Sequence, residues 1–186
     1  MFQYPFSKKK ENNQIINKTR LGKTLEQNID LTNDFYREKN IAMIFKNEIP
    51  IKIVKVKYLI RQQAKITEAY YNKKSLPDYQ GIYKGRYLCF DTKETNNLNN
   101  FPLSNVPSHQ IDILDKIKKF NGISFFIINF KKKNKYFYMP IEFLINYLKT
   151  NTKKSINYEI FQKELYEINF SYYPKLDYIK IVNHFI

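Results

Sequence analysis

The stretch PDYQGIYKGRYLCFDTKET, residues 77–95, decides the fold of this chain. Two runs of strand-forming residues flank Lys84-Gly85, a pair typical of a tight turn, so the stretch predicts a β-hairpin. Side chains alternate along a strand, and Asp91 and Lys93 therefore share one face about 7 Å apart. The hairpin also folds Asp78 back toward that face. We expect two acids and a lysine to meet on the sheet.

Two carboxylates that meet without a cation repel each other, and one of them is forced to protonate. A hard divalent cation removes this conflict, since Mg²⁺ takes oxygen ligands and is typically held by one or two carboxylates plus a substrate phosphate. Such an ion polarises a phosphate and lowers the pKa of a bound water, while an ammonium group stabilises charge on phosphoryl oxygens. The pattern therefore indicates phosphodiester hydrolysis with Mg²⁺, for which Mn²⁺ can substitute.

The order Pro77-Asp78, then Asp91-Thr92-Lys93, matches the PD-(D/E)XK nuclease pattern. On its own this pattern has low specificity, because any basic protein with strands produces D-x-K by chance. The alternative for Asp91 and Lys93 is a surface ion pair worth well under ~1 kcal/mol.

The composition favours a polyanionic partner. The 186 residues include 32 Lys and Arg against 17 Asp and Glu, a formal charge of +15. Nucleic acid fits this charge best, and an anionic membrane surface fits it less often. The alternative is an AT-rich coding sequence, which loads a protein with Lys, Asn, Ile and Tyr regardless of function. No apolar run approaches the ~20 residues of a membrane span, so we expect a cytoplasmic protein.

The chain length predicts one domain, residues 21–186, behind a flexible basic arm at residues 1–20. A first helix is expected from Thr24 to about Lys39, and a second after Ser108 as its N-cap. Strand patterns cover 41–45, 51–60, the hairpin, 123–130 and 135–140, with further helical pieces toward the C-terminus. Residues 61–74 fit either a helix or a protruding hairpin. The order predicts a mixed α/β fold around one sheet.

Four separated stretches resemble the RecU family of Holliday junction resolvases, over roughly residues 21–181. They are GKTLEQNIDLTNDFY, the DYQGIYKGRY hairpin with FDTKET, FPLSNVPSHQ and LDYIKI. The resemblance implies a restriction-endonuclease-like fold with a mixed central sheet flanked by helices, and a stalk-like insertion at 57–75 that enters the centre of a four-way DNA junction. It also implies a homodimer, magnesium dependence, paired incisions in recombination and DNA repair, and a nucleoid-associated bacterial enzyme.

By motif position, the resemblance makes Asp78 and Asp91 metal carboxylates, Lys93 the transition-state-stabilising lysine and Gln110 a further metal-site residue. Without the resemblance, we would interpret Gln110 as an ordinary solvated side chain in the first turn of a helix. The chain departs from the family at Leu76, where a Thr is usual, and at Asp91, where a Glu is usual.

For several other residues, both a functional role and an ordinary structural role are possible. Glu26 is a possible accessory acid near the site or a first-turn glutamate that the helix dipole favours. A catalytic role for His109 is less expected than a structural one. Basic residues are candidates for DNA phosphates, although each can equally be a solvated cation. They are Arg20, Lys23, Arg61, Lys65, Lys84 and Arg86.

Of three possible functions, we expect the first, and the other two are alternatives. The first is a magnesium-dependent endonuclease that resolves Holliday junctions as a homodimer. The second is a less selective nuclease of the PD-(D/E)XK type. The third is an architectural protein that binds junctions through a weakened or inactive nuclease site.

Overall fold

The structure, a computed structural model, describes residues 24–48, 50–57, 64–71 and 76–186. Its helices are α2 (Leu25–Glu38), α3 (Ser108–Lys119), α4 (Ile141–Thr150), α5 (Tyr158–Glu164) and α6 (Ile179–Val182). Its strands are β1 (Met43–Lys46), β2 (Ile51–Lys57), β3 (Lys65–Tyr71), β4 (Tyr79–Tyr83), β5 (Arg86–Thr95), β6 (Asn100–Pro102), β7 (Ile123–Phe130), β8 (Lys135–Pro140), β9 (Ser155–Asn157) and β10 (Tyr166–Ile168).

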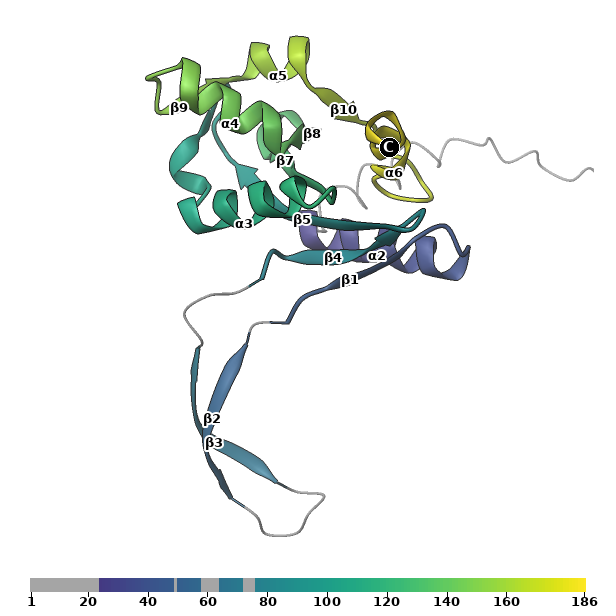
Figure 1. Ribbon diagram of the computed structural model, residues 1–186, viewed down its shortest axis with the longest axis vertical. Coiled ribbons are helices and arrows are strands. Elements are labelled where there is room, and N and C mark those ends of the chain that lie inside the picture. The colour runs from purple at the N-terminus through teal and green to yellow at the C-terminus, as the bar shows by residue number, and fades with distance from the viewer. Residues whose placement is uncertain (1–23, 49, 58–63, 72–75) are drawn as a thin grey trace, which may run out of the picture.

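A six-stranded mixed sheet in the order β1-β4-β5-β7-β8-β10 forms the centre of the protein (Figure 1). Strands β5 and β7 run parallel, and every other neighbouring pair is antiparallel. The parallel pair needs a crossover, and α3 supplies it. The mixed α/β sheet flanked by helices, expected from the sequence, is confirmed.

Helices cover both faces of this sheet, which explains why all eight residues of β7 are buried. On one face, α2 and α6 pack on alternate residues of the central strands, including Leu88, Phe90 and Phe125. On the other face, α3, α4 and α5 pack on the residues between them, including Cys89 and Phe126. A strand buried on both faces is a nearly continuous apolar run, and ISFFIINF is such a run.

An aromatic ladder crosses the α2 face from β4 to β8. The ring centroids of Tyr79 and Phe90 lie 4.8 Å apart, those of Phe90 and Phe125 4.7 Å, and those of Phe125 and Tyr138 4.3 Å. Such pairs contribute roughly 0.5–1.5 kcal/mol each beyond the area they bury. The ladder fixes the register of the strands that carry the acids.

The hairpin predicted from residues 77–95 is present as β4 and β5. Lys84 and Gly85 both adopt positive φ, 47° and 74°, which a two-residue turn of this hand requires. Gly81 allows β1 to approach β4 closely, because a Cβ there would lie 2.1 Å from the Met43 carbonyl oxygen. The strand order β1-β4-β5 therefore depends on this glycine.

Strands β2 and β3 form a separate antiparallel ribbon that extends away from the sheet (Figure 1). For Lys65–Tyr71 the strand alternative holds, while 61–63 and 72–74 lie outside the described residues. The ribbon starts at Ile51, before the start predicted for the stalk-like insertion.

The first helix begins at Leu25, one residue after the predicted start, and Thr24 is its N-cap in a capping box with Gln27. The prediction for the second helix was wrong by one residue. Ser108 is its first helical residue, and Pro107 is the N-cap without a side-chain bond. Proline has no N–H to lose and its fixed φ suits the entry to a helix. Among the described residues, no helix is long and apolar enough to cross a membrane.

Candidate active site at the end of the β4–β5 hairpin

One hydrogen bond joins Asp78 to Asp91 where β4 begins, and two more join Thr92 to the Asp78 carboxylate. The Asp78 backbone N–H donates to Asp91 Oδ1 at 3.1 Å. The Thr92 N–H and hydroxyl both donate to Asp78 Oδ2, at 3.0 and 3.1 Å. The Asp78 carboxylate thus accepts hydrogen bonds from β5 one residue before the β4–β5 backbone pairing begins at Tyr79. The geometry places the two acids side by side, as the hairpin pattern predicted.

Lys93 completes the group. Its Nζ lies 3.9 Å from Asp91 Oδ1, and the exposed fractions of the two side chains are 16% and 0%. The alternative of a solvated surface pair does not fit these exposures, because both groups are largely removed from water. The structure therefore brings together Asp78, Asp91 and Lys93.

Burial, and after it the adjacent Asp78, raise the pKa of Asp91 to about 7. The Lys93 ammonium and the Asp78 N–H oppose this rise. A carboxyl group with this pKa exchanges a proton near neutral pH, and a second cation beside it would favour the ionised form. The site is thus short of positive charge despite its lysine.

Two oxygen acceptors, one on Asp91 and one on Gln110, have no hydrogen-bond partner among the described residues. Both Asp91 Oδ2 and Gln110 Oε1 are buried and unpaired in the described part of the chain. They belong to the same face, because Cys89, two residues before Asp91, packs in one cluster with Leu114, one turn after Gln110. A buried acceptor without a partner costs about 1–3 kcal/mol, so it marks a position where a ligand fits.

This donor set fits a magnesium ion. Within the described residues, no three His, Cys, Asp or Glu side chains form a cluster that could hold a metal by themselves. Magnesium does not require such a cluster, because it keeps several waters and accepts one or two carboxylates. The residues present that could hold it are Asp78, Asp91 and Gln110.

Sequence reasoning missed three residues that shape the site. Thr92 was expected to point away with the core residues, and it is buried, yet its hydroxyl reaches Asp78. Glu94 accepts the Leu25 N–H at 3.2 Å and fixes the start of α2 against β5. Asn47 donates its N–H to Asp78 O at 2.7 Å. Only the FDTKET match could have indicated Thr92 and Glu94, and Asn47 carries no local signal.

A pocket of about 640 Å³ opens beside Lys93 between the start of α2 and the end of β5. Glu26 lines it, and its Oε2 accepts from Lys46 Nζ at 2.6 Å. His109 and Leu76 are exposed, and Leu76 precedes Pro77 without contributing a ligand. Leu76 cannot do so, since an alkyl side chain has no donor oxygen.

The predicted DNA-contacting residues are not gathered in one place. Lys84 and Arg86 lie at the opposite end of the hairpin from the acids, where Lys84 donates to Asn183 and Arg86 donates to the Asn121 and Phe185 carbonyls. Lys65 lies on the projecting ribbon. Arg20, Lys23 and Arg61 lie outside the described residues.

Comparison with known proteins identifies the family. The model of the RecU family, Recombination protein U, matches residues 20–184. The chain belongs to the RecU family. It is 43% identical over 171 residues to the Holliday junction resolvase RecU of Lactobacillus acidophilus, covering 92% of this chain and 81% of that protein.

Other RecU proteins are similarly close. The Holliday junction resolvase RecU of Leuconostoc citreum is 40% identical over 196 residues, covering 98% of this chain and 96% of that protein. The Holliday junction resolvase RecU of Staphylococcus carnosus is 40% identical over 168 residues, covering 89% of this chain and 81% of that protein. A solved structure of Archaeoglobus fulgidus Hjc, a Holliday junction resolvase, matches 72% of this chain and 91% of its own at a TM-score of 0.40 and 11% identity.

Proposed function

We propose that this RecU-family chain is a homodimeric, divalent-metal-dependent endonuclease that resolves Holliday junctions by paired incision in recombination and DNA repair. One observation carries the proposal. The Asp78 N–H donates to Asp91 Oδ1, the Lys93 ammonium lies 3.9 Å from that oxygen, and the other Asp91 oxygen is buried without a partner among the described residues.

The carboxylates and Gln110 hold Mg²⁺, with Mn²⁺ as a substitute. When bound, such an ion polarises the scissile phosphate and lowers the pKa of water. Asp78 Oδ2 accepts the two Thr92 bonds, so Oδ1 is the oxygen that this carboxylate offers to the ion. Asp91 and Gln110 each contribute an unpaired oxygen from the α3 face. These three acceptors are preorganised, because the sheet and α3 hold their backbones.

Lys93 acts on the substrate phosphate. Its side chain is 16% exposed, so the ammonium is close to the pocket yet shielded from bulk water. A cation in such a place stabilises charge on phosphoryl oxygens more strongly than in water. Glu26 is an accessory residue at the pocket rim, where it orients Lys46.

A second copy of the chain covers the open apolar surface, which we define as Met43, Phe45, Ile82 and Tyr87. These side chains are 55%, 50%, 57% and 41% exposed, and they lie on the α3 face beyond the strands that helices cover. The β2–β3 ribbon adds Ile51, Ile53, Val54 and Ile66, all exposed. An isolated two-stranded ribbon is marginally stable in water, so a partner ribbon stabilises it.

A homodimer of this kind explains two symmetric nicks, because a two-fold axis presents two identical sites. The paired ribbons enter the junction centre with Lys65 near phosphates, and Arg61 is a further basic residue for DNA. Arg20 and Lys23 are further basic residues for DNA. We place this activity at the nucleoid in the bacterial cytoplasm, where branched DNA arises.

The oligomeric state tests the surface directly. Ile82→Lys puts a charge into the open apolar surface, and Tyr172→Lys makes the same change at an exposed aromatic residue (79%) outside it. Sedimentation equilibrium of the wild type and of Tyr172→Lys should give dimers, whereas Ile82→Lys should raise the dimer Kd more than tenfold. A monomeric wild type would overturn the dimer proposal.

Cleavage of a labelled synthetic four-way junction, with and without Mg²⁺, tests the chemistry. Asp78→Asn keeps an oxygen that accepts the Thr92 bonds and removes the charge, so this variant should fold, bind the junction and not cut. Asp115→Asn, a surface acid paired with Lys119, should cut normally. Retained cutting by Asp78→Asn would exclude Asp78 from the site.

The same assay separates the alternatives. Cutting of linear duplex as fast as of the junction would favour a less selective nuclease. Tight junction binding without cutting in either Mg²⁺ or Mn²⁺ would favour the architectural protein, for which the departures at Leu76 and Asp91 are the supporting observation.

A further inference from the structure

A short basic turn, Lys131–Lys133, lies at the same end of the sheet as the candidate active site. Because β5 and β7 are parallel, Lys93 is level with Ile128, and Lys131 follows three residues later. At ~3.3 Å per residue, the turn is about 10 Å beyond Lys93 along the sheet and one strand to the side. Lys131 Nζ lies 3.4 Å from Glu94 Oε2, and Glu94 also lines the pocket beside Lys93.

The lysines of this turn differ in their partners. Lys131 pairs with Glu94, and Lys135, just past the turn, pairs with Glu167 at 2.6 Å. For Lys132 and Lys133, no described residue places a carboxylate oxygen within 4.0 Å. Two ammonium groups of the turn are therefore available to an external anion.

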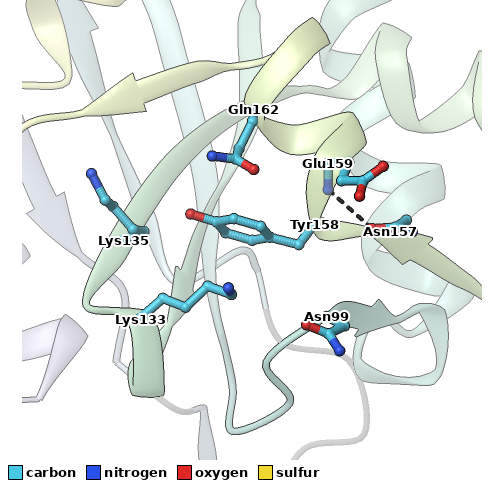
Figure 2. Close-up of a pocket in the computed structure, with 7 residues that line it drawn as sticks. All are labelled: Asn99, Lys133, Lys135, Asn157, Tyr158, Glu159 and Gln162. Carbon is cyan, nitrogen blue, oxygen red and sulfur yellow. Dashed lines mark hydrogen bonds between the residues drawn. The ribbon is translucent and has the colours of Figure 1, made fainter.

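Lys133 forms one wall of a second pocket, of about 660 Å³ (Figure 2). Its Nζ lies 4.3 Å from the centroid of the Tyr158 ring, which holds the ammonium at a fixed place. Figure 2 shows Lys135 on the same side of the pocket as the Tyr158 hydroxyl, with Gln162 and Asn99 at its margins. Hydroxyl and amide groups of this kind donate to phosphate oxygens together with lysines. Glu159, also in the lining, is exposed.

The distance between the turn and Lys93 matches a whole number of nucleotide steps along a DNA strand. Phosphates on one strand advance about 3.4 Å along the duplex axis per nucleotide, so about 10 Å corresponds to roughly three nucleotides. We infer that Lys132 and Lys133, with the Tyr158 pocket, bind backbone phosphates of a junction arm about three nucleotides from the cut. This inference rests on the proposed function and adds a part of the DNA interface to it.

The salt dependence of junction binding tests the inference. Lys132→Gln/Lys133→Gln removes two phosphate contacts, and the slope of log K against log salt should become shallower by about 0.9 for each contact. Lys131 is left unchanged because Glu94 also anchors α2. The control, Lys116→Gln/Lys119→Gln, removes the same charge from α3 at the far end of the sheet, and its slope should match that of the wild type.

The rate at saturating junction gives a second readout. The turn holds DNA away from the reacting phosphate, so kcat of the double variant should equal that of the wild type while KM rises about tenfold or more at ~0.1 M salt, as two lost counterion-releasing contacts require. A fall in kcat with unchanged KM would overturn the inference.

Neutral methylphosphonate links in the substrate locate the contact. Links two to four nucleotides from the cut should weaken binding by the wild type and have little effect on Lys132→Gln/Lys133→Gln. An equal loss for both proteins would overturn the inference and leave the proposed function intact. A wild type that neither binds nor cuts the junction would overturn both.

Discussion

The two ends of the β4–β5 hairpin carry similar residue types and use them differently. At the turn, Lys84 donates to Asn183, and Arg86 makes three bonds to backbone carbonyls. At the open end, Lys93 is 3.9 Å from Asp91, and no described residue pairs with the second Asp91 oxygen. The first end satisfies its charges within the chain, while the second leaves donors and acceptors for a ligand. The difference teaches that unsatisfied groups, rather than charge itself, distinguish the end that we propose as the active site.

The largest expected effect is that of Lys93→Ala. Removing a group that stabilises transition-state charge typically lowers kcat by about 10²–10³, and we expect a loss of that size for junction cutting at saturating substrate. Lys84→Ala is the matched control at the other end of the hairpin and should retain the wild-type kcat. Equal losses in the two variants would remove the distinction between the ends.

The pH dependence of metal binding should follow Asp91. The pKa of Asp91 is raised to about 7 in the folded protein. Between about pH 4 and pH 7 the folded protein therefore carries a proton on Asp91, while an unfolded chain with an ordinary carboxyl group does not. Mn²⁺ binding should therefore weaken by about tenfold per pH unit below pH 7, since the ion and the proton compete. Electron paramagnetic resonance of free Mn²⁺ between pH 5.5 and 8 measures this.

The same pKa has a consequence for stability without metal. Between the unfolded and folded values of the pKa, the folded state binds more protons, so the free energy of unfolding should decrease as the pH rises through this window. Asp91→Asn cannot titrate and should abolish both dependences. A dependence on pH that survives in Asp91→Asn would assign it to another group.

A smaller effect is expected for Thr92→Val. The change removes the hydroxyl that donates to Asp78 Oδ2 but keeps the backbone N–H donor. A single hydrogen bond contributes about 1 kcal/mol, so metal affinity should fall several-fold, and Thr92→Ser should restore it. Titration calorimetry with Mg²⁺ compares the three proteins. Wild-type affinity in Thr92→Val would show that one donor suffices to hold Asp78.

The smallest effect should come from Lys84→Gln. Its ammonium is exposed and bonded to Asn183, so we expect a loss of unfolding free energy under ~0.5 kcal/mol and an unchanged salt slope for junction binding. Chemical denaturation and binding at several salt concentrations measure both. A slope reduced by about 0.9 would return Lys84 to the set of DNA contacts.

Much of the fold could be predicted, because local patterns there agree with the tertiary structure. The pair Lys84-Gly85 fits a tight β-hairpin turn, and the apolar run of β7 fits a strand buried on both faces. The short strands β6, β9 and β10 could not be predicted, since three residues carry too little periodicity. Residues 61–74 stayed ambiguous because Lys65–Tyr71 is an exposed ribbon strand without a buried face to reveal its period.

Some residues of the candidate site could likewise be predicted from the sequence, and others could not. Alternation placed Asp91 beside Lys93, and the hairpin placed Asp78 beside both. Alternation alone could not identify Thr92 or Asn47, because both contact Asp78 through the tertiary structure. For Thr92 the FDTKET match was the remaining signal, and Asn47 had none. The second pocket was missed because the lysines of the β7–β8 turn read only as a connection between strands.

The crossover from β5 through α3 to β7 has a consequence for how proteins of this shape can vary. Both carboxylates, the lysine and the glutamine are attached to one contiguous stretch of chain, from Asp78 to the end of β7. The ribbon of β2 and β3 precedes that stretch and shares no strand pairing with it. Residues can therefore be inserted into or deleted from the ribbon to suit a different branched substrate, while the cutting chemistry is inherited unaltered.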